Sequence, residues 1–140
     1  MDKTGLDNKI DSMMMLIDKL STALNELQRE KEPSRNELFM FAAEKKAEEI
    51  IELATSINQV LLRTKNKVSV SYHESFTQLS IFNVFTEKEL SILASTAGFR
   101  NRLAHEYLTV DSKIAVKTMQ NMLLIYPLYL KKVKKIMSIL

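Results

Sequence analysis

Residues 10–27 read IDSMMMLIDKLSTALNEL, and their aliphatic side chains recur at alternating intervals of three and four residues. The positions that share this spacing are Ile10, Met13, Ile17, Leu20, Leu24 and Leu27. Because an α-helix completes a turn in ~3.6 residues, these side chains lie on one helical face, which must be buried against other elements. The pattern stops at the polar run 28–32 and Pro33, so the helix is predicted to end there.

A second helix is predicted to begin at Ser34, because Ser34 and Glu37 have the spacing of a capping box. Its buried face is predicted to consist of Ala43, Ala47, Ile50, Ala54, Ile57 and Leu61. The small side chains in this set let a neighbouring helix approach closely. The polar and basic stretch 63–71 follows, and it is predicted to be a loop that can contact a phosphate backbone.

Capping-box spacings also mark two helices in the middle of the chain. Ser71 with Glu74 predicts a short helix, and Thr86 with Glu89 predicts a longer one. Gly98 lowers helix stability, so it is expected to mark a bend or a close contact in the longer helix.

The last segment is predicted to be a long helix that begins after Asp111, a favourable N-cap residue. Its apolar positions again alternate by four and three: Met122, Tyr126, Tyr129, Val133, Ile136 and Leu140. Pro127 removes one backbone donor and is expected to kink this helix. Long helices joined by short loops predict an all-α, up-and-down bundle of four to five helices, in a single domain that spans residues 1–140.

Composition excludes several classes of function. The chain has no cysteine, which rules out a disulfide framework, a thiolate metal site and a cysteine nucleophile. Two histidines are too few for a histidine-rich metal site, and no P-loop, GxGxxG or HExxH motif is present. We therefore expect neither a metal nor a cofactor. The net charge of +3 permits a polyanionic partner, but an ordinary solvated surface is the more common reason for such a charge.

No segment is expected to enter a membrane. The first ten residues, MDKTGLDNKI, lack the apolar core of a secretory signal. The longest apolar stretch, residues 119–130, is shorter than the ~20 residues that a spanning helix needs, and lysines follow it. A cytoplasmic location is predicted, and the absence of cysteine suits that compartment.

Residues 98–107, GFRNRLAHEY, combine side-chain types that permit the cleavage of RNA by internal transesterification. Histidine is a residue type that serves as a proton donor and acceptor, so His105 can transfer protons to and from the ribose and the leaving oxygen. Arg100 can hold the phosphate through two hydrogen bonds, and Asn101 can orient the imidazole or the phosphate. Taken singly, each residue also fits a salt-bridged surface helix, with Tyr107 at the edge of the core.

Helical geometry separates the two principal groups. Arg100 and His105 lie roughly 140° apart around the helix axis at ~100° per residue. They converge only if the arginine side chain wraps around the helix, if the helix is distorted, or if a second chain contributes. One histidine does not easily act as base and acid at once, whereas a two-fold dimer supplies His105 and Arg100 twice. A composite site across a dimer axis is therefore predicted.

The spacing of Arg100, His105 and Tyr107 resembles the RxxxxHxY motif of HepT-like proteins in the HEPN superfamily. The segments 71–79, 36–61 and the C-terminal helix are also similar to that family. The resemblance implies an HEPN-like bundle that forms a homodimer or a higher even-numbered oligomer through its motif-bearing helices. It makes Arg100 and His105 catalytic, with Asn101 in a supporting role.

The resemblance further implies the toxin of a type II toxin–antitoxin pair, a metal-independent endoribonuclease with RNA as its substrate. Its partner would be an MntA-like nucleotidyltransferase antitoxin that silences it by AMPylation of Tyr107, a residue that would also help to bind RNA. Two alternatives stay open at this point. One is a non-catalytic helical protein that binds RNA or nucleotide as the partner of a nucleotidyltransferase, and the other is a purely structural bundle subunit.

Overall fold

The structure, a computed structural model, describes residues 3–105 and 111–140. Its elements in chain order are α1 (Lys3–Arg29), α2 (Pro33–Arg63), α3 (Tyr72–Thr77), the 3-10 helix η1 (Gln78–Phe82), α4 (Glu87–Ala104) and α5 (Ser112–Ser138). The described residues include no β-strand. The prediction of an all-α bundle is confirmed.

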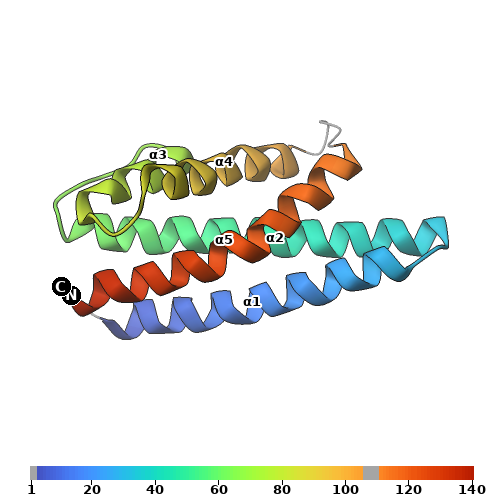
Figure 1. Ribbon diagram of the computed structural model, residues 1–140, viewed down its shortest axis with the longest axis horizontal. Coiled ribbons are helices and arrows are strands. Elements are labelled where there is room, and N and C mark those ends of the chain that lie inside the picture. Colours follow the sequence, from blue (N-terminus) through green and yellow to red (C-terminus); the bar gives the residue numbers. More distant parts are fainter. Residues whose placement is uncertain (1–2, 106–110) are drawn as a thin grey trace.

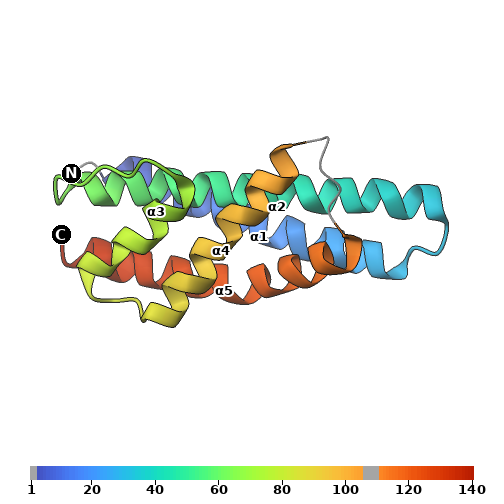
Figure 2. The ribbon, with the colours of Figure 1, turned by 90° about the horizontal axis from the view of Figure 1, so that it is seen from above.

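The helices form an elongated up-and-down bundle. α1 and α2 run antiparallel along its length, and α5 lies against α1 (Figure 1). α3 and α4 form a further layer over α2 and α5, and α4 crosses that pair obliquely (Figure 2). α4 ends partway along α2, so the first part of α2 continues beyond it (Figure 2). The residues at the end of α4 are therefore presented near the middle of the long α2 helix.

The predicted helical faces line one hydrophobic core to which all five α-helices contribute. In α1 every residue of the predicted face is buried except Ile17, which is half-buried. In α2 the whole predicted face is buried. In α5 the predicted face is buried up to Ile136, whereas Leu140 is 40% exposed because it lies after the end of the helix.

Helix starts agree with the sequence prediction in two places and differ in one. Thr86 and Glu89 make a complete capping box, and the Asp111 carboxylate accepts two backbone hydrogen bonds as the N-cap of α5. The prediction that Ser34 caps α2 is wrong, because Glu32 is the N-cap. Pro33 takes the first helical position, where its fixed φ fits and its missing N–H has no consequence.

Two smaller predictions also differ from the structure. Ser71 Oγ accepts from the backbone N–H of Glu74 at 3.0 Å, but the Glu74 carboxylate accepts from Val70 rather than from Ser71. The capping box at α3 is therefore only half formed. A close contact at Gly98 is wrong as well, because a Cβ there would meet nothing nearer than Arg102 Nη1, at 4.0 Å.

A buried polar network fixes α3 on α2 and α5. The Tyr129 hydroxyl lies 2.6 Å from Oδ1 of Asn58, and the amide of Asn58 donates to Ser75 Oγ at 3.2 Å. Ser75 Oγ in turn donates to the backbone carbonyl of Tyr72 at 2.7 Å. Burial raises the pKa of Tyr129 well above its usual value, so this phenol stays neutral. Leaving any of these buried groups without its partner costs about 1–3 kcal/mol, so the network holds the start of α3 in place.

Candidate active site

The predicted catalytic residues lie at the carboxyl end of α4. Arg100 is in the last turn and a half of the helix and is half-buried, whereas Asn101 is exposed. His105 is the exposed C-cap residue, with φ −100° and ψ 92°. Tyr107, the predicted modification site, lies outside the described residues. Of the three motif residues, the structure therefore describes Arg100, which is half-buried within α4, and His105, which is exposed at its end.

Arg100 is held by residues from two other helices. Its Nη2 donates to Oε1 of Glu52 in α2 at 2.8 Å, and its guanidinium carbon lies 4.6 Å from the ring centroid of Tyr72 in α3. The side chains of Arg100 and Glu52 are 24% and 40% exposed. The hydrogen bond to Glu52 raises the pKa of Arg100, so the guanidinium keeps its charge at any pH that the protein meets.

The sequence left three ways for Arg100 and His105 to meet: the arginine wraps around the helix, the helix is distorted, or a second chain contributes. α4 is helical through Ala104, so no distortion of the helix joins the two groups. Arg100 is directed toward α2 and α3, while His105 begins the chain segment that leaves the helix. A contribution from a second chain stays a prediction.

Sequence reasoning did not identify Glu52 and Tyr72 as neighbours of Arg100. Tyr72 lies in the segment 71–79 that resembles the family, but nothing in its spacing assigned it a role. Glu52 was one acidic residue among several on a long helix. The contact joins residues 48 positions apart, so only the packing of α2 against α4 reveals it.

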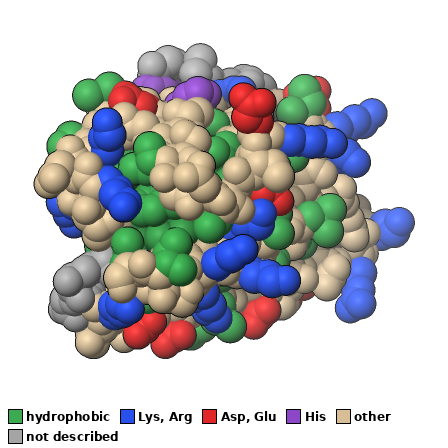
Figure 3. Space-filling model, turned by 60° about the vertical axis from the view of Figure 1, so that its left-hand side comes forward, with side chains coloured by type: hydrophobic (Ala, Val, Ile, Leu, Met, Phe, Trp, Pro, Cys, Tyr) green, Lys and Arg blue, Asp and Glu red, His purple; other side chains and the backbone are tan. Residues whose placement is uncertain are grey.

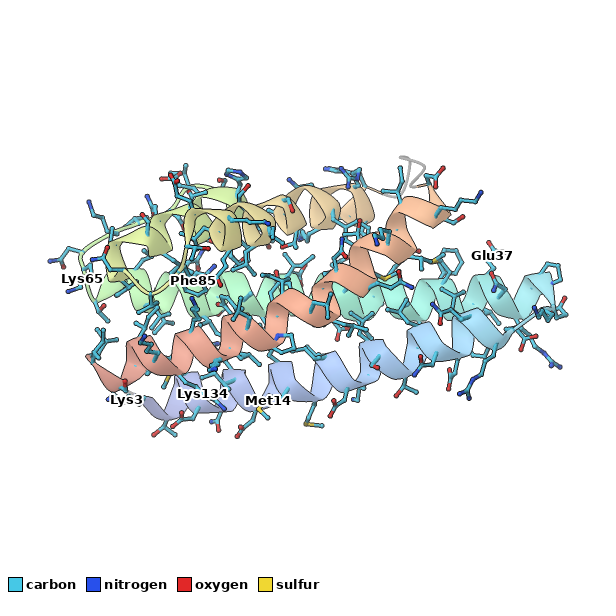
Figure 4. The ribbon with its side chains drawn as sticks, viewed as in Figure 1. Lys3, Met14, Glu37, Lys65, Phe85 and Lys134 are labelled. Carbon is cyan, nitrogen blue, oxygen red and sulfur yellow. The ribbon has the colours of Figure 1, made fainter. Side chains whose placement is uncertain are left out.

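Basic side chains also gather away from the motif. A hollow of about 230 Å³ at the end of α2 is lined by Gln59, Arg63, Lys67, Val68 and Ser69. Figure 4 places Lys65 at this end of the molecule and Glu37 at the opposite end. In Figure 3, where this end is turned toward the viewer, Lys and Arg side chains surround a hydrophobic area. The stretch 63–71 was predicted to be a loop, and residues 64–71 do form one, whereas Arg63 is the last residue of α2. Contact of this loop with a phosphate backbone stays a prediction.

The described residues, 3–105 and 111–140, contain no group of three or more His, Cys, Asp or Glu side chains that is placed to hold a metal ion. Across the same ranges, every helix is too short or too polar to span a bilayer.

Comparison with known proteins finds similarity both in sequence and in fold. The family model for HepT-like ribonucleases matches residues 13–136. A tRNA nuclease HepT from Aphanizomenon flos-aquae (strain 2012/KM1/D3) is 31% identical over 85 residues, which cover 60% of this chain and 58% of that protein. A tri-AMPylated HEPN toxin from Shewanella oneidensis, solved in complex with an MNT antitoxin, superposes with a TM-score of 0.80 at 19% identity.

The structural match covers 91% of this chain and 95% of the Shewanella toxin, and at that identity it shows that the two share a fold. The alignment to the tRNA nuclease spans less than two thirds of that relative. The family model covers most of the chain, including Arg100, His105 and the helices that surround them. The chain therefore belongs to the HepT-like ribonuclease family.

Proposed function

We propose that this protein is the toxin of a type II toxin–antitoxin pair and that it cleaves RNA without a metal ion. The observation that carries the proposal is the setting of Arg100, whose guanidinium is held by Glu52 and Tyr72 five residues before an exposed histidine. A fixed guanidinium suits a phosphate that gains negative charge during reaction, and an exposed imidazole is able to reach a strand of RNA.

In the proposed reaction, His105 takes the proton from a ribose 2′-hydroxyl, and the freed oxygen attacks the adjacent phosphorus. The new O2′–P bond forms as the P–O5′ bond breaks, and a second imidazole returns a proton to the leaving 5′-oxygen. Arg100 binds the phosphate oxygens and stabilises their charge in the transition state. Asn101 is exposed one helical turn before His105 and supports the imidazole or the phosphate.

A homodimer, or a higher even-numbered oligomer, is part of this proposal. Leu38 and Phe41 of α2 are 65% and 58% exposed, which is unusual for large apolar side chains. At ~100° per residue they project within about 40° of the direction of Glu52, so these two apolar side chains continue the face of α2 that holds Arg100. In this proposal a second subunit covers Leu38 and Phe41 and brings its own Arg100 and His105 close to those of the first.

The proposed partner is a nucleotidyltransferase that modifies Tyr107. The Shewanella toxin of the same fold is described as tri-AMPylated and in complex with an MNT antitoxin, which supports a partner of that class here. An AMP group would add bulk and negative charge close in sequence to Arg100 and His105, where it would compete with RNA for the guanidinium.

Incubation with the cognate transferase and ATP is expected to add about 329 Da per AMP group at Tyr107 and to lower RNA cleavage. Peptide mass spectrometry locates the modification, and a gel-based assay measures the activity. Tyr107→Phe is the matched control, because it keeps the ring and removes the acceptor oxygen. Loss of activity in the treated wild type with Tyr107 still unmodified would contradict the proposal.

The purified wild-type protein tests the proposed reaction directly. We expect it to cleave RNA in the presence of EDTA and to leave fragments that end in a 2′,3′-cyclic phosphate. The relative is named a tRNA nuclease, so transfer RNA is the first substrate to test, with messenger RNA beside it. Intact RNA under all conditions, together with measurable RNA binding, would instead support the alternative of a non-catalytic binding partner.

A further inference from the structure

We propose that Glu52 and Tyr72 are positioning residues for Arg100, which hold its guanidinium ready to meet a phosphate of the RNA. The inference rests on the proposed function, since it concerns how the catalytic arginine is prepared. It adds two residues, from α2 and α3, to a site otherwise drawn only from the end of α4.

The first step of the argument is the number of restraints on one flexible side chain. Arginine loses considerable rotamer freedom when it is fixed, and a lone surface ion pair seldom achieves this. Here the guanidinium is bound at Nη2 by Glu52 and covered on one face by the ring of Tyr72. The ion pair restrains the Nη2 end of the guanidinium, and the aromatic ring restrains its central carbon, so two contacts from different helices limit its movement.

The second step is that the backbone segments which carry the two restraining residues are joined by buried hydrogen bonds. The backbone carbonyl of Tyr72 accepts from Ser75, which accepts from the amide of Asn58. Asn58 lies on α2, the helix that also carries Glu52, and the buried phenol of Tyr129 fixes its side chain. Both restraints on Arg100 are therefore tied to the same rigid part of the core.

The third step concerns which hydrogens remain for a phosphate. A guanidinium has five N–H groups, and Glu52 accepts from Nη2. Nε is buried and has no hydrogen-bond partner among the described residues. A phosphate that approaches from solvent must therefore use the end of the guanidinium that carries Nη1 and Nη2. Orienting that end in advance removes a rearrangement from the reaction.

Glu52 also sets how strongly Arg100 attracts RNA before the reaction. Its carboxylate partly neutralises the guanidinium, which weakens the attraction to phosphate in the ground state. A rigid arrangement that favours the transition state over the substrate raises kcat rather than lowering KM. Removing the charge of Glu52 should therefore affect kcat and KM differently.

In a cleavage assay, Glu52→Gln is expected to lower kcat by roughly 10- to 100-fold while KM stays unchanged or falls. Glu49→Gln is the matched control, because it removes the same charge from the same helix at a residue paired with Lys46 at 3.8 Å. The control should retain wild-type kcat and KM. Wild-type kcat in Glu52→Gln, or an equal loss in Glu49→Gln, would overturn the assignment of Glu52.

A second measurement does not depend on RNA cleavage. In the full chain, the rate at which phenylglyoxal modifies Arg100 is compared with the rate at Arg102, an exposed arginine on the same helix. Tyr72→Leu is expected to raise the rate at Arg100 relative to Arg102 by roughly two- to fivefold, the range that a cation–π contact gives at a part-exposed site. Tyr72→Phe keeps the ring and should retain the wild-type ratio, and Glu52→Gln should raise it.

The two assays separate the failure of this inference from the failure of the proposed function. If the wild type leaves RNA intact, the proposed function fails, and the phenylglyoxal ratio still decides whether Glu52 and Tyr72 hold Arg100. If the wild type cleaves RNA but neither Glu52→Gln nor Tyr72→Leu changes kcat or the ratio, the proposed function stands and the positioning role is overturned.

Discussion

Replacing His105 by alanine is expected to lower the rate of RNA cleavage by between ~10²- and ~10⁴-fold, the range that a positioned proton-transfer group supplies. Arg100→Ala should lower it by ~10²- to ~10³-fold, because the developing charge on the phosphate loses its cation. Single-turnover cleavage of labelled transfer RNA measures both.

The same two variants test whether the site is composite. In a heterodimer of Arg100→Ala and His105→Ala, a groove shared across the two-fold axis contains one intact Arg100 and one intact His105. In that groove the single imidazole acts as the base, the single guanidinium binds the phosphate, and water protonates the leaving oxygen, whereas each parent groove lacks both copies of one group. Mixing and exchanging the two weakened proteins is then expected to give activity above that of either parent and below that of the wild type. If each subunit instead forms its own site, every site in the mixture lacks one group and the mixture stays inactive.

Arg102→Ala provides the control for both experiments. Arg102 is exposed on α4 close to the motif, and the family motif does not include it. Its replacement removes a positive charge near the RNA without touching Arg100 or His105. Near wild-type cleavage is expected, with some loss of affinity at low salt. A loss as large as that of Arg100→Ala would mean that the basic surface as a whole, rather than the motif, carries the activity.

The helices could be predicted because the spacing of apolar residues in the sequence matches the helical period and so identifies the buried face of each helix. Ala43, Ala47 and Leu61 fall on the inward face of α2 as the helical period requires, and so does Met13 in α1. The start of α2 was harder, since both Ser34 and Glu32 are able to cap a helix. Pro33 decides between them, because proline is favoured at the first helical position and the N-cap is the residue directly before it, Glu32.

The site could be predicted only in part, for a different physical reason. The RxxxxHxY spacing identifies Arg100 and His105 because their relation is local in the sequence. The contact with Glu52 depends on where α4 crosses α2, and that crossing is set by the packing of many core side chains. The stack on Tyr72 depends in addition on the buried hydrogen bonds that fix α3. Contacts of this kind join residues far apart in the sequence, so no local sequence pattern predicts them.

The exposed side chains of Leu38 and Phe41 on α2 lead to a prediction about dimer formation and activity. α4 ends partway along α2, and the first part of α2 continues beyond it (Figure 2). Leu38 and Phe41 belong to that first part of α2 and are exposed. Burying two such side chains at a symmetric interface stabilises the dimer twice over, because each residue occurs once in each subunit. An aspartate at the same position would have to be buried without a partner, or would prevent the subunits from meeting.

The double variant Leu38→Asp/Phe41→Asp is therefore expected to be monomeric at concentrations where the wild type is dimeric, and to lose RNA cleavage by more than ~100-fold. Analytical ultracentrifugation measures the assembly, and circular dichroism shows whether the helices persist. Val68→Asp is the control, since Val68 is 79% exposed on the loop at the other end of the bundle. A double variant that becomes monomeric but still cleaves RNA at the wild-type rate would contradict the composite site. One that stays dimeric and active would remove α2 from the interface.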